Sequence, residues 1–232
     1  MSNKVDYWVD FWNIYTKNSK AQDEHSQVLR TLNKEPISND IWEFTLSTIE
    51  NAIEPKKDDD LLELCCGNGL ISRYLSPKVK NITAVDISVE LINTIDTNKY
   101  LNIKAIDSDI RCLTYDDKSF DKIIIYAGIQ YLNYSETIKL FEQIYTWLKP
   151  GGILFLGDIP DKDKLWAFYN TLEREAVYFN NTKEEIDVVG TWFEKDFFNK
   201  LGDFIGFSTG EVMEQDKKLI YSNFRYDFKL IK

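Results

Sequence analysis

Residues 60–72 decide the fold, and they read Asp60-Leu61-Leu62-Glu63-Leu64-Cys65-Cys66-Gly67-Asn68-Gly69-Leu70-Ile71-Ser72. The pattern predicts a short apolar strand, a tight glycine-containing turn and the start of a helix. Glycine in such a turn lets a ligand approach the backbone closely, since no side chain blocks it. The first turn of the following helix offers unpaired N–H groups. The stretch therefore predicts a ligand site at the end of a strand.

Two more acidic residues follow strand-like segments further along the chain. Asp86 ends the segment 81–86, and Asp109 follows the segment 102–106. Together with Glu63, they place a carboxylate near the end of each of three strands. Because parallel strands end at one edge of a sheet, we expect a nucleoside-type ligand to lie across that edge.

These segments resemble, in order, the motifs of class I S-adenosylmethionine-dependent methyltransferases. Glu63-x-Cys65-x-Gly67-x-Gly69 resembles the first motif, with Cys65 in place of its first glycine. The later motifs are matched by Ala84-Val85-Asp86-Ile87-Ser88 (ribose binding), Asp107-Ser108-Asp109-Ile110 (adenine binding), Phe120-Asp121-Lys122-Ile123-Ile124-Ile125-Tyr126 (fourth strand) and Leu148-Lys149-Pro150-Gly151-Gly152-Ile153-Leu154. The resemblance covers roughly residues 40 to 160. Cysteine is small, so we expect the first turn to survive with slightly less room beneath a cofactor.

The alternation of strands and helices predicts an α/β fold with right-handed crossovers. Strands are expected at 61–65, 81–85, 102–106, 123–125 and 153–156, with helices between them that include 88–97 and one capped by Ser135. Residues 161–203 are expected to be mainly helical, followed by strands at 204–212 and 221–231. The resemblance implies a Rossmann-like doubly wound sheet of seven strands, mostly parallel with an antiparallel last strand, and helices on both faces.

The whole chain is expected to form one domain. Its predicted parts are an N-terminal aromatic arm (1–35), a cofactor-binding core (36–160) and substrate-side helices with a closing hairpin (161–232). In the arm, five aromatic residues recur at helical spacing: Tyr7, Trp8, Phe11, Trp12 and Tyr15. This stripe predicts a helix packed on the core, a lid over the cofactor and substrate, or both.

The resemblance implies S-adenosylmethionine as cofactor and S-adenosylhomocysteine as product. It assigns Asp86, with Ile87, to the ribose, Asp109 and the Ile110 N–H to the adenine, and Cys65, Gly67 and the Tyr126 carbonyl to the amino-acid part. Gly69, in the same first motif, is also expected to bind the cofactor. Glu63 is expected to orient the turn or to meet the cofactor's ammonium through water. Arg30 is a candidate partner of the cofactor's carboxylate, and Tyr15 belongs to the arm that would cover it.

The catalytic candidates are Asp158 and His25. Asp158 follows the fifth strand and is expected on the substrate side, and His25 is the one histidine of the sequence, a residue type that titrates near neutral pH. Either would serve as a base for a neutral hydroxyl acceptor, whereas an ionised acceptor needs none. Tyr126, Gln130 and Tyr131 follow the fourth strand and are expected to line the acceptor pocket.

Composition narrows the choice of partners. The formal net charge of −10 argues against an electrostatic grip on nucleic acid. Three cysteines form no even disulfide framework, which fits a cytoplasmic location, and no metal site is indicated. No apolar run approaches the length of a membrane span. The sequence leaves the oligomeric state open.

The sequence is compatible with three functions. The leading one is methyl transfer to a small molecule, with a sugar, nucleotide-sugar or surface-glycan phosphate group as the first expectation for the acceptor. An NAD-dependent oxidoreductase would need a third glycine where Ser72 stands. A non-catalytic S-adenosylmethionine-binding regulatory module is the third.

Overall fold

The computed structural model describes residues 4–19, 23–184 and 189–232, and a seven-stranded sheet is its centre. The strand order is β5-β4-β3-β6-β7-β9-β8. The strands span Asp60–Leu64 (β3), Asn81–Asp86 (β4), Ile103–Asp107 (β5), Phe120–Tyr126 (β6), Leu148–Pro160 (β7), Thr209–Glu214 (β8) and Arg225–Ile231 (β9). The first five run parallel to one another, and β9 runs antiparallel to both β7 and β8. This confirms the predicted sheet and its antiparallel last strand.

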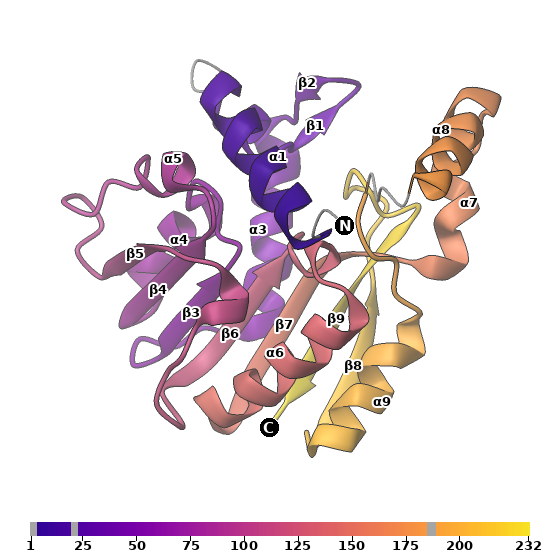
Figure 1. Ribbon diagram of the computed structural model, residues 1–232. Coiled ribbons are helices and arrows are strands. Elements are labelled where there is room, and N and C mark those ends of the chain that lie inside the picture. The colour runs from indigo at the N-terminus through magenta and orange to yellow at the C-terminus, as the bar shows by residue number, and fades with distance from the viewer. Residues whose placement is uncertain (1–3, 20–22, 185–188) are drawn as a thin grey trace.

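Helices cover both faces of the sheet (Figure 1), and its central strands are therefore buried on both sides. On β6, Ile123 and Ile125 belong to one core cluster and Ile124 to the other, as the two-residue period of a strand requires. The first cluster packs against α6 (Tyr134–Trp147) and α9 (Lys195–Ile205). The second packs against α3 (Asn39–Ile53), α4 (Leu70–Leu75) and α5 (Val89–Ile92).

Several predicted boundaries are wrong. The helix expected over 88–97 is the four-residue α5, although Ser88 caps it as predicted. The cap of α6 is Asn133 rather than Ser135, and Asn133 forms a capping box with Glu136. Strand β7 begins at Leu148, before the expected 153–156, with a register shift while it passes Lys149 to Gly152.

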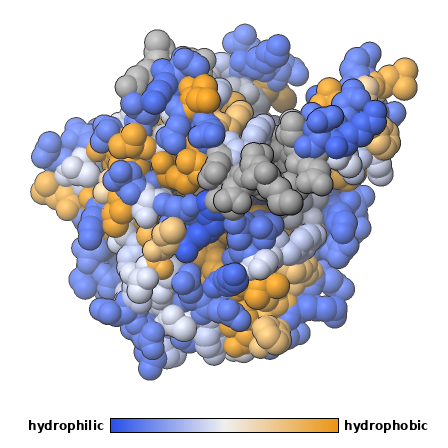
Figure 2. Space-filling model, in the orientation of Figure 1, coloured by the Kyte–Doolittle hydropathy of each residue, from blue (hydrophilic) through white to orange (hydrophobic). Residues whose placement is uncertain are grey.

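The C-terminal third also differs in detail. Helices η4 (Lys162–Lys164), α7 (Leu165–Phe168) and α8 (Leu172–Lys183) precede α9, and α9 continues to Ile205, so the strand expected from 204 starts at Thr209. Strand β9 starts at Arg225 rather than 221. Figure 1 shows α8 standing away from the sheet. The side chains of Trp166 on α7 and of Leu172, Val177 and Phe179 on α8 are exposed, and Figure 2 shows orange atoms among blue ones on this projecting part.

The N-terminal arm is helical, as the aromatic stripe predicts. Helix α1 (Lys4–Ser19) lies over the carboxyl edge of the sheet (Figure 1). It is followed by α2 (Glu24–Gln27) and by a small hairpin, β1 (Thr31–Leu32) with β2 (Glu35–Pro36), that the sequence pattern did not predict. None of the helices in the described part of the chain combines the length and apolarity that crossing a membrane requires.

Candidate active site

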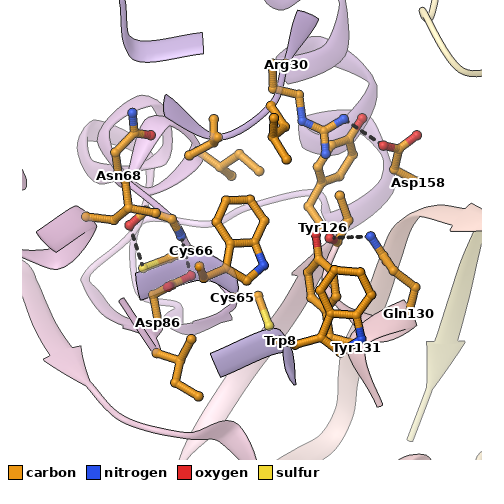
Figure 3. A pocket seen from close by; sticks show the side chains of 18 of the residues that line it. Trp8, Arg30, Cys65, Cys66, Asn68, Asp86, Tyr126, Gln130, Tyr131 and Asp158 are labelled. Atoms are coloured by element: carbon orange, nitrogen blue, oxygen red, sulfur yellow. Dashed lines mark hydrogen bonds and ion pairs between the residues drawn. The ribbon is translucent and has the colours of Figure 1, made fainter. Parts of the chain in front are cut away.

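A cavity of about 390 Å³ lies at the carboxyl edge of the sheet, between the strand ends and the N-terminal arm. Its volume is in the range of small-molecule sites. Figure 3 shows Asn68, Cys66 and Asp86 on one side of it and Arg30, Tyr126, Gln130 and Asp158 on the other. We call these the turn side and the arginine side. The cavity therefore has two chemically different halves.

The turn after β3 forms the floor of the turn side. Cys65, Gly67 and Gly69 all have positive φ, at 58°, 57° and 75°. Cys65 thus holds, as a non-glycine residue, the left-handed conformation that favours glycine. The room for its side chain comes from Gly128, where an added Cβ would lie 2.6 Å from the Cys65 sulfur. The turn survives the substitution, as predicted.

Asp86 ties this turn to the end of β4. Its two carboxylate oxygens accept hydrogen bonds from the Gly67 N–H (2.8 Å) and the Ser88 N–H (2.9 Å). Burial raises the pKa of Asp86, and the two N–H groups oppose that rise. Each carboxylate oxygen can accept a further hydrogen bond. The side chain lines the cavity and can therefore receive ligand hydroxyls while it holds the turn.

Glu63 lies deeper, under the turn. It is 1% exposed, and the Ser72 hydroxyl donates to its Oε2. Burial raises the pKa of Glu63 to about 8, with the negative charge of Asp86 as a second cause. A mostly protonated Glu63 at neutral pH fits a role in fixing the start of α4. Ser72, where a dinucleotide fingerprint needs glycine, is used for this contact.

The third acid, Asp109, begins a short 3₁₀ helix at the end of β5. Both of its oxygens accept from the Arg111 side chain, and Oδ1 also accepts from the Arg111 N–H. Arg111 in turn donates to Glu136 at 3.0 Å. Asp109, Ile110 and Arg111 all line the cavity. The network holds the loop that would face an adenine ring.

The N-terminal arm forms the roof. Trp8, Phe11 and Trp12 line the cavity, and the Trp8 ring lies 4.7 Å from that of Tyr131. Asn68 in the turn donates to the Glu24 carbonyl (2.9 Å) and the Gln27 side chain (3.1 Å), which joins the turn to α2. The Asn68 Oδ1 atom is buried and has no partner among the described residues.

On the arginine side, a β-bulge aims Asp158 into the cavity. The register of β7 against β9 shifts between Leu156 and Ile159, and Asp158 has a φ of 61°. Its Oδ2 accepts from Arg30 at 2.6 Å, and Arg225 donates to its carbonyl. Burial alone would raise the pKa of Asp158, but Arg225 and Arg30 outweigh it and hold the pKa below its usual range. Such a carboxylate is a weak base.

Most residues that the sequence predicts for the site do line this cavity: Arg30, Glu63, Cys65, Gly67, Asp86, Ile87, Asp109, Ile110, Tyr126, Asp158, and with them Gln130 and Tyr131. Gly69, Tyr15 and His25, though described, are not among the lining residues. Gly69 caps α4, and the Tyr15 hydroxyl donates to the Ser26 carbonyl at 2.6 Å.

His25 packs against Trp42, with ring centroids 5.4 Å apart, and burial lowers its pKa. His25 does not line the cavity, so its role as a base stays a prediction.

Four further residues line the cavity although the sequence analysis did not select them: Asn68, Arg111, Tyr221 and Arg225. For Asn68 a signal existed, since it stands between the two glycines of the turn.

Comparison with known proteins supports the resemblance of the core. Residues 61–152 match the family described as a methyltransferase domain. The ubiquinone/menaquinone biosynthesis C-methyltransferase of Rickettsia prowazekii is 30% identical over 164 residues, which are 64% of this chain and 61% of that protein. The chain thus spans less than two thirds of that relative's length.

Solved structures share the fold over the full chain. The complex titled DhpI-SAM-HEP covers 100% of this chain and 99% of its own, with a TM-score of 0.68 and 14% identity. Phosphoethanolamine N-methyltransferase 1 of Haemonchus contortus, solved with phosphoethanolamine and S-adenosylhomocysteine, covers 98% of this chain and 49% of its own, with a TM-score of 0.69 and 12% identity. The resemblance to class I methyltransferases and the Rossmann-like fold are confirmed.

Proposed function

We propose that this chain transfers the methyl group of S-adenosylmethionine to a small molecule and releases S-adenosylhomocysteine. The observation that carries the proposal is the two-sided cavity. Its turn side presents the Cys65–Asn68 backbone with Asp86 and Asp109, and its arginine side lies across the cavity, with Arg30 and Asp158 opposite Asp86. One half suits an adenosyl ligand, and the other leaves space for an acceptor.

The turn side fits the cofactor by its donor and acceptor set. Asp86 would accept from the ribose hydroxyls, Asp109 and the Ile110 N–H would meet the adenine, and the turn backbone would hold the amino-acid part. The unpaired Asn68 Oδ1 is a buried acceptor suited to an ammonium group. When bound, S-adenosylmethionine supplies a sulfonium methyl group that is already electrophilic.

The protein's own residues then have two tasks, alignment and exclusion of water. Cys65, Ala127 and Asp158, at the ends of β3 and β6 and within β7, all have positive φ and fix the walls from three sides. Trp8, Phe11 and Trp12 of α1 close the roof. Holding two reactants in line at short distance accounts for a large part of a transfer rate.

The name of the Rickettsia prowazekii relative refers to ubiquinone and menaquinone biosynthesis. It does not support the expectation that the acceptor is a sugar or a glycan phosphate. We therefore propose a small-molecule acceptor without that restriction. The oxidoreductase alternative conflicts with Ser72, whose hydroxyl is bound to Glu63 beneath the turn.

The test is calorimetry with S-adenosylhomocysteine and NAD, followed by transfer of labelled methyl groups to quinone, amine, carboxylate and phosphate acceptors. We expect S-adenosylhomocysteine to bind and NAD not to bind. Binding of NAD alone would overturn the proposal. Binding of S-adenosylhomocysteine with no transfer to any acceptor class would favour a regulatory module.

A further inference from the structure

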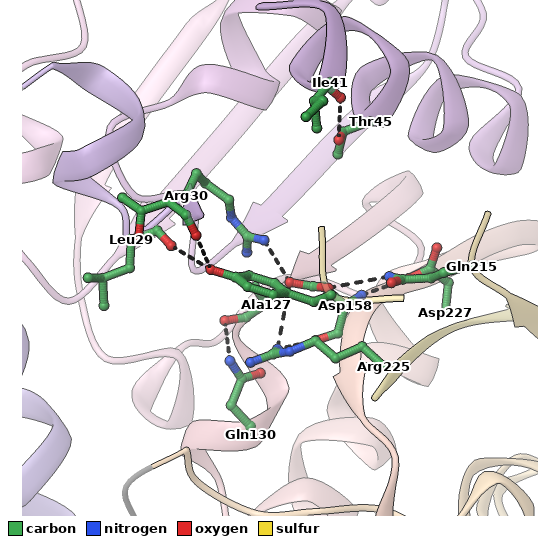
Figure 4. Close-up of polar contacts among 12 residues, drawn as sticks. Leu29, Arg30, Ile41, Thr45, Ala127, Gln130, Asp158, Gln215, Arg225 and Asp227 are labelled. Carbon is green, nitrogen blue, oxygen red and sulfur yellow. Dashed lines mark hydrogen bonds and ion pairs between the residues drawn. The ribbon is translucent and has the colours of Figure 1, made fainter. Parts of the chain in front are cut away.

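The arginine side contains two buried guanidinium groups that face one carboxylate. Arg30 follows α2, and Arg225 is the first residue of β9. Both line the cavity, and they are 9% and 8% exposed. Figure 4 shows them on either side of Asp158. Segments from the two ends of the chain therefore bring two positive charges to one place.

The charges in this cluster do not balance. Arg30 Nη1 donates to Asp158 Oδ2 at 2.6 Å, and Arg225 Nη1 lies 3.6 Å from the same oxygen. Asp227, the next acid in the cluster, accepts from the Asp158 N–H and from Gln215, each at 2.7 Å. Burial raises the pKa of Asp227 to about 7, so it supplies only part of a negative charge at neutral pH.

The remaining acids of the cavity are engaged elsewhere. Asp86 accepts from the turn N–H groups, Asp109 is paired with Arg111, and Glu63 is held by Ser72. The arginine side thus keeps an excess of positive charge, in a chain whose formal net charge is −10. Burying a charge without a partner is costly, so such a site favours an anionic ligand.

Arg225 also has an unused donor. Its Nε is buried and has no hydrogen-bond partner among the described residues, and its Nη1 donates to the Asp158 carbonyl. Aromatic rings hold both guanidiniums in place. The Arg30 Cζ lies 4.9 Å from the Tyr126 ring centroid, and the Arg225 Cζ lies 5.3 Å from that of Tyr221. A planar guanidinium fixed in this way is suited to oxyanions.

We propose that Arg225 and Arg30 bind an oxyanion of the methyl acceptor, a carboxylate or a phosphate or phosphonate group. The assignment rests on the proposed function of the cavity. Asp158 positions the two guanidiniums and is not the base. The oxyanion fixes the acceptor on the arginine side and leaves the turn side to the cofactor.

The experiment measures binding of three probes of similar shape, with and without saturating S-adenosylhomocysteine. Benzoate and phenylphosphonate are the two oxyanion arms, and benzamide is the neutral match. We expect at least one oxyanion to bind tenfold or more tightly than benzamide, and the stronger of the two identifies the oxyanion type. Equal binding of all three probes, or binding of none, overturns the assignment.

The variants are Arg225→Gln, Arg225→Lys and the control Lys229→Gln. Lys229 lies on the same strand and on the same face as Arg225, but it pairs with Glu54 and does not line the cavity. We expect oxyanion affinity to fall tenfold or more in Arg225→Gln, less in Arg225→Lys, and to be unchanged in Lys229→Gln. Unchanged affinity in Arg225→Gln overturns the assignment. Should Arg225→Gln fail to fold, the oxyanion assignment is still tested by Arg225→Lys and by the comparison of the three probes on the parent protein.

Binding of S-adenosylhomocysteine is measured in the same titrations and separates the two proposals. If the parent protein binds S-adenosylhomocysteine but shows no preference for the oxyanion probes over benzamide, the oxyanion subsite alone is overturned. Failure of S-adenosylhomocysteine to bind at all overturns the proposed function.

Discussion

Individual residues in this site serve both the fold and the ligand. Asp86 stands at a strand end where the sequence suggests a ribose acceptor, yet its two oxygens also fasten the Gly67 and Ser88 N–H groups. Sequence position reveals the first task, because the motif spacing carries it. The second depends on how the turn folds back on β4, which the order of residues does not specify.

We expect Asp86→Ala to weaken S-adenosylhomocysteine binding by about 2–4 kcal/mol, or roughly 30- to 1000-fold. Because the substitution also frees two buried N–H groups, the unfolding free energy should fall by about 1.5–3 kcal/mol. Calorimetry and thermal melts measure the two effects. The control is Asp117→Ala, an exposed residue in the turn before β6. Parent-like affinity in a folded Asp86→Ala protein would contradict the ribose assignment.

Glu63 gives a prediction about pH. Burial raises its pKa in the folded protein to about 8, above the usual value of 4.5. The folded state therefore binds more protons than the unfolded state between these values, and stability falls as pH rises, by up to about 1.4 kcal/mol per pH unit. We expect Glu63→Gln to lose this part of the slope in denaturant titrations between pH 5 and 9. An identical slope in parent and variant would show that Glu63 is ionised in the fold.

At the scale of elements, the sequence predicts what is local and misses what is distant. Strand β6 and the turn after β3 were predictable because apolar runs and glycines mark them. The bulge at Asp158 was not, because it depends on the register of β7 against β9. The Arg30–Asp158 pair joins residues 128 positions apart, and no local pattern signals such a contact. The sequence therefore predicts the cofactor half of the site better than the arginine half.

Helix α1 belongs to the site more than to the core. Trp8, Val9, Phe11 and Trp12 of this helix line the cavity, and neither core cluster contains a residue from it. We expect removal of residues 1–20 to weaken S-adenosylhomocysteine binding tenfold or more, with a smaller change in thermal stability. Calorimetry and melts check this, with Trp166→Ala on α7 as a control for loss of an exposed aromatic residue. If the truncated protein kept full affinity for S-adenosylhomocysteine, the arm would serve only to pack against the rest of the fold.

Over the whole molecule, function depends on closing one edge of the sheet. The parallel strands bring their ends together, β9 brings Arg225 from the last part of the chain, and α1 with the segment 28–31 closes the cavity. A cavity built from such distant segments couples ligand binding to the stability of the entire fold, since unfolding any part opens it. The cofactor should therefore stabilise the chain globally.

This coupling can be measured as a melting temperature. A ligand that binds only the folded state, at 100 times its dissociation constant, adds about 2.7 kcal/mol. For a chain of this size, about 1 kcal/mol raises Tm by roughly 2–4 °C. We therefore expect S-adenosylhomocysteine to raise Tm by roughly 5–10 °C at that concentration, and NAD at equal concentration to leave it unchanged. The shift should shrink in Asp86→Ala, which loses cofactor contacts, and persist in Lys229→Gln, which loses none. An equal shift with NAD would mean that the turn side recognises only the adenosine that NAD and S-adenosylhomocysteine share. The assignment of the amino-acid part to the Cys65–Gly69 turn would then have to be withdrawn.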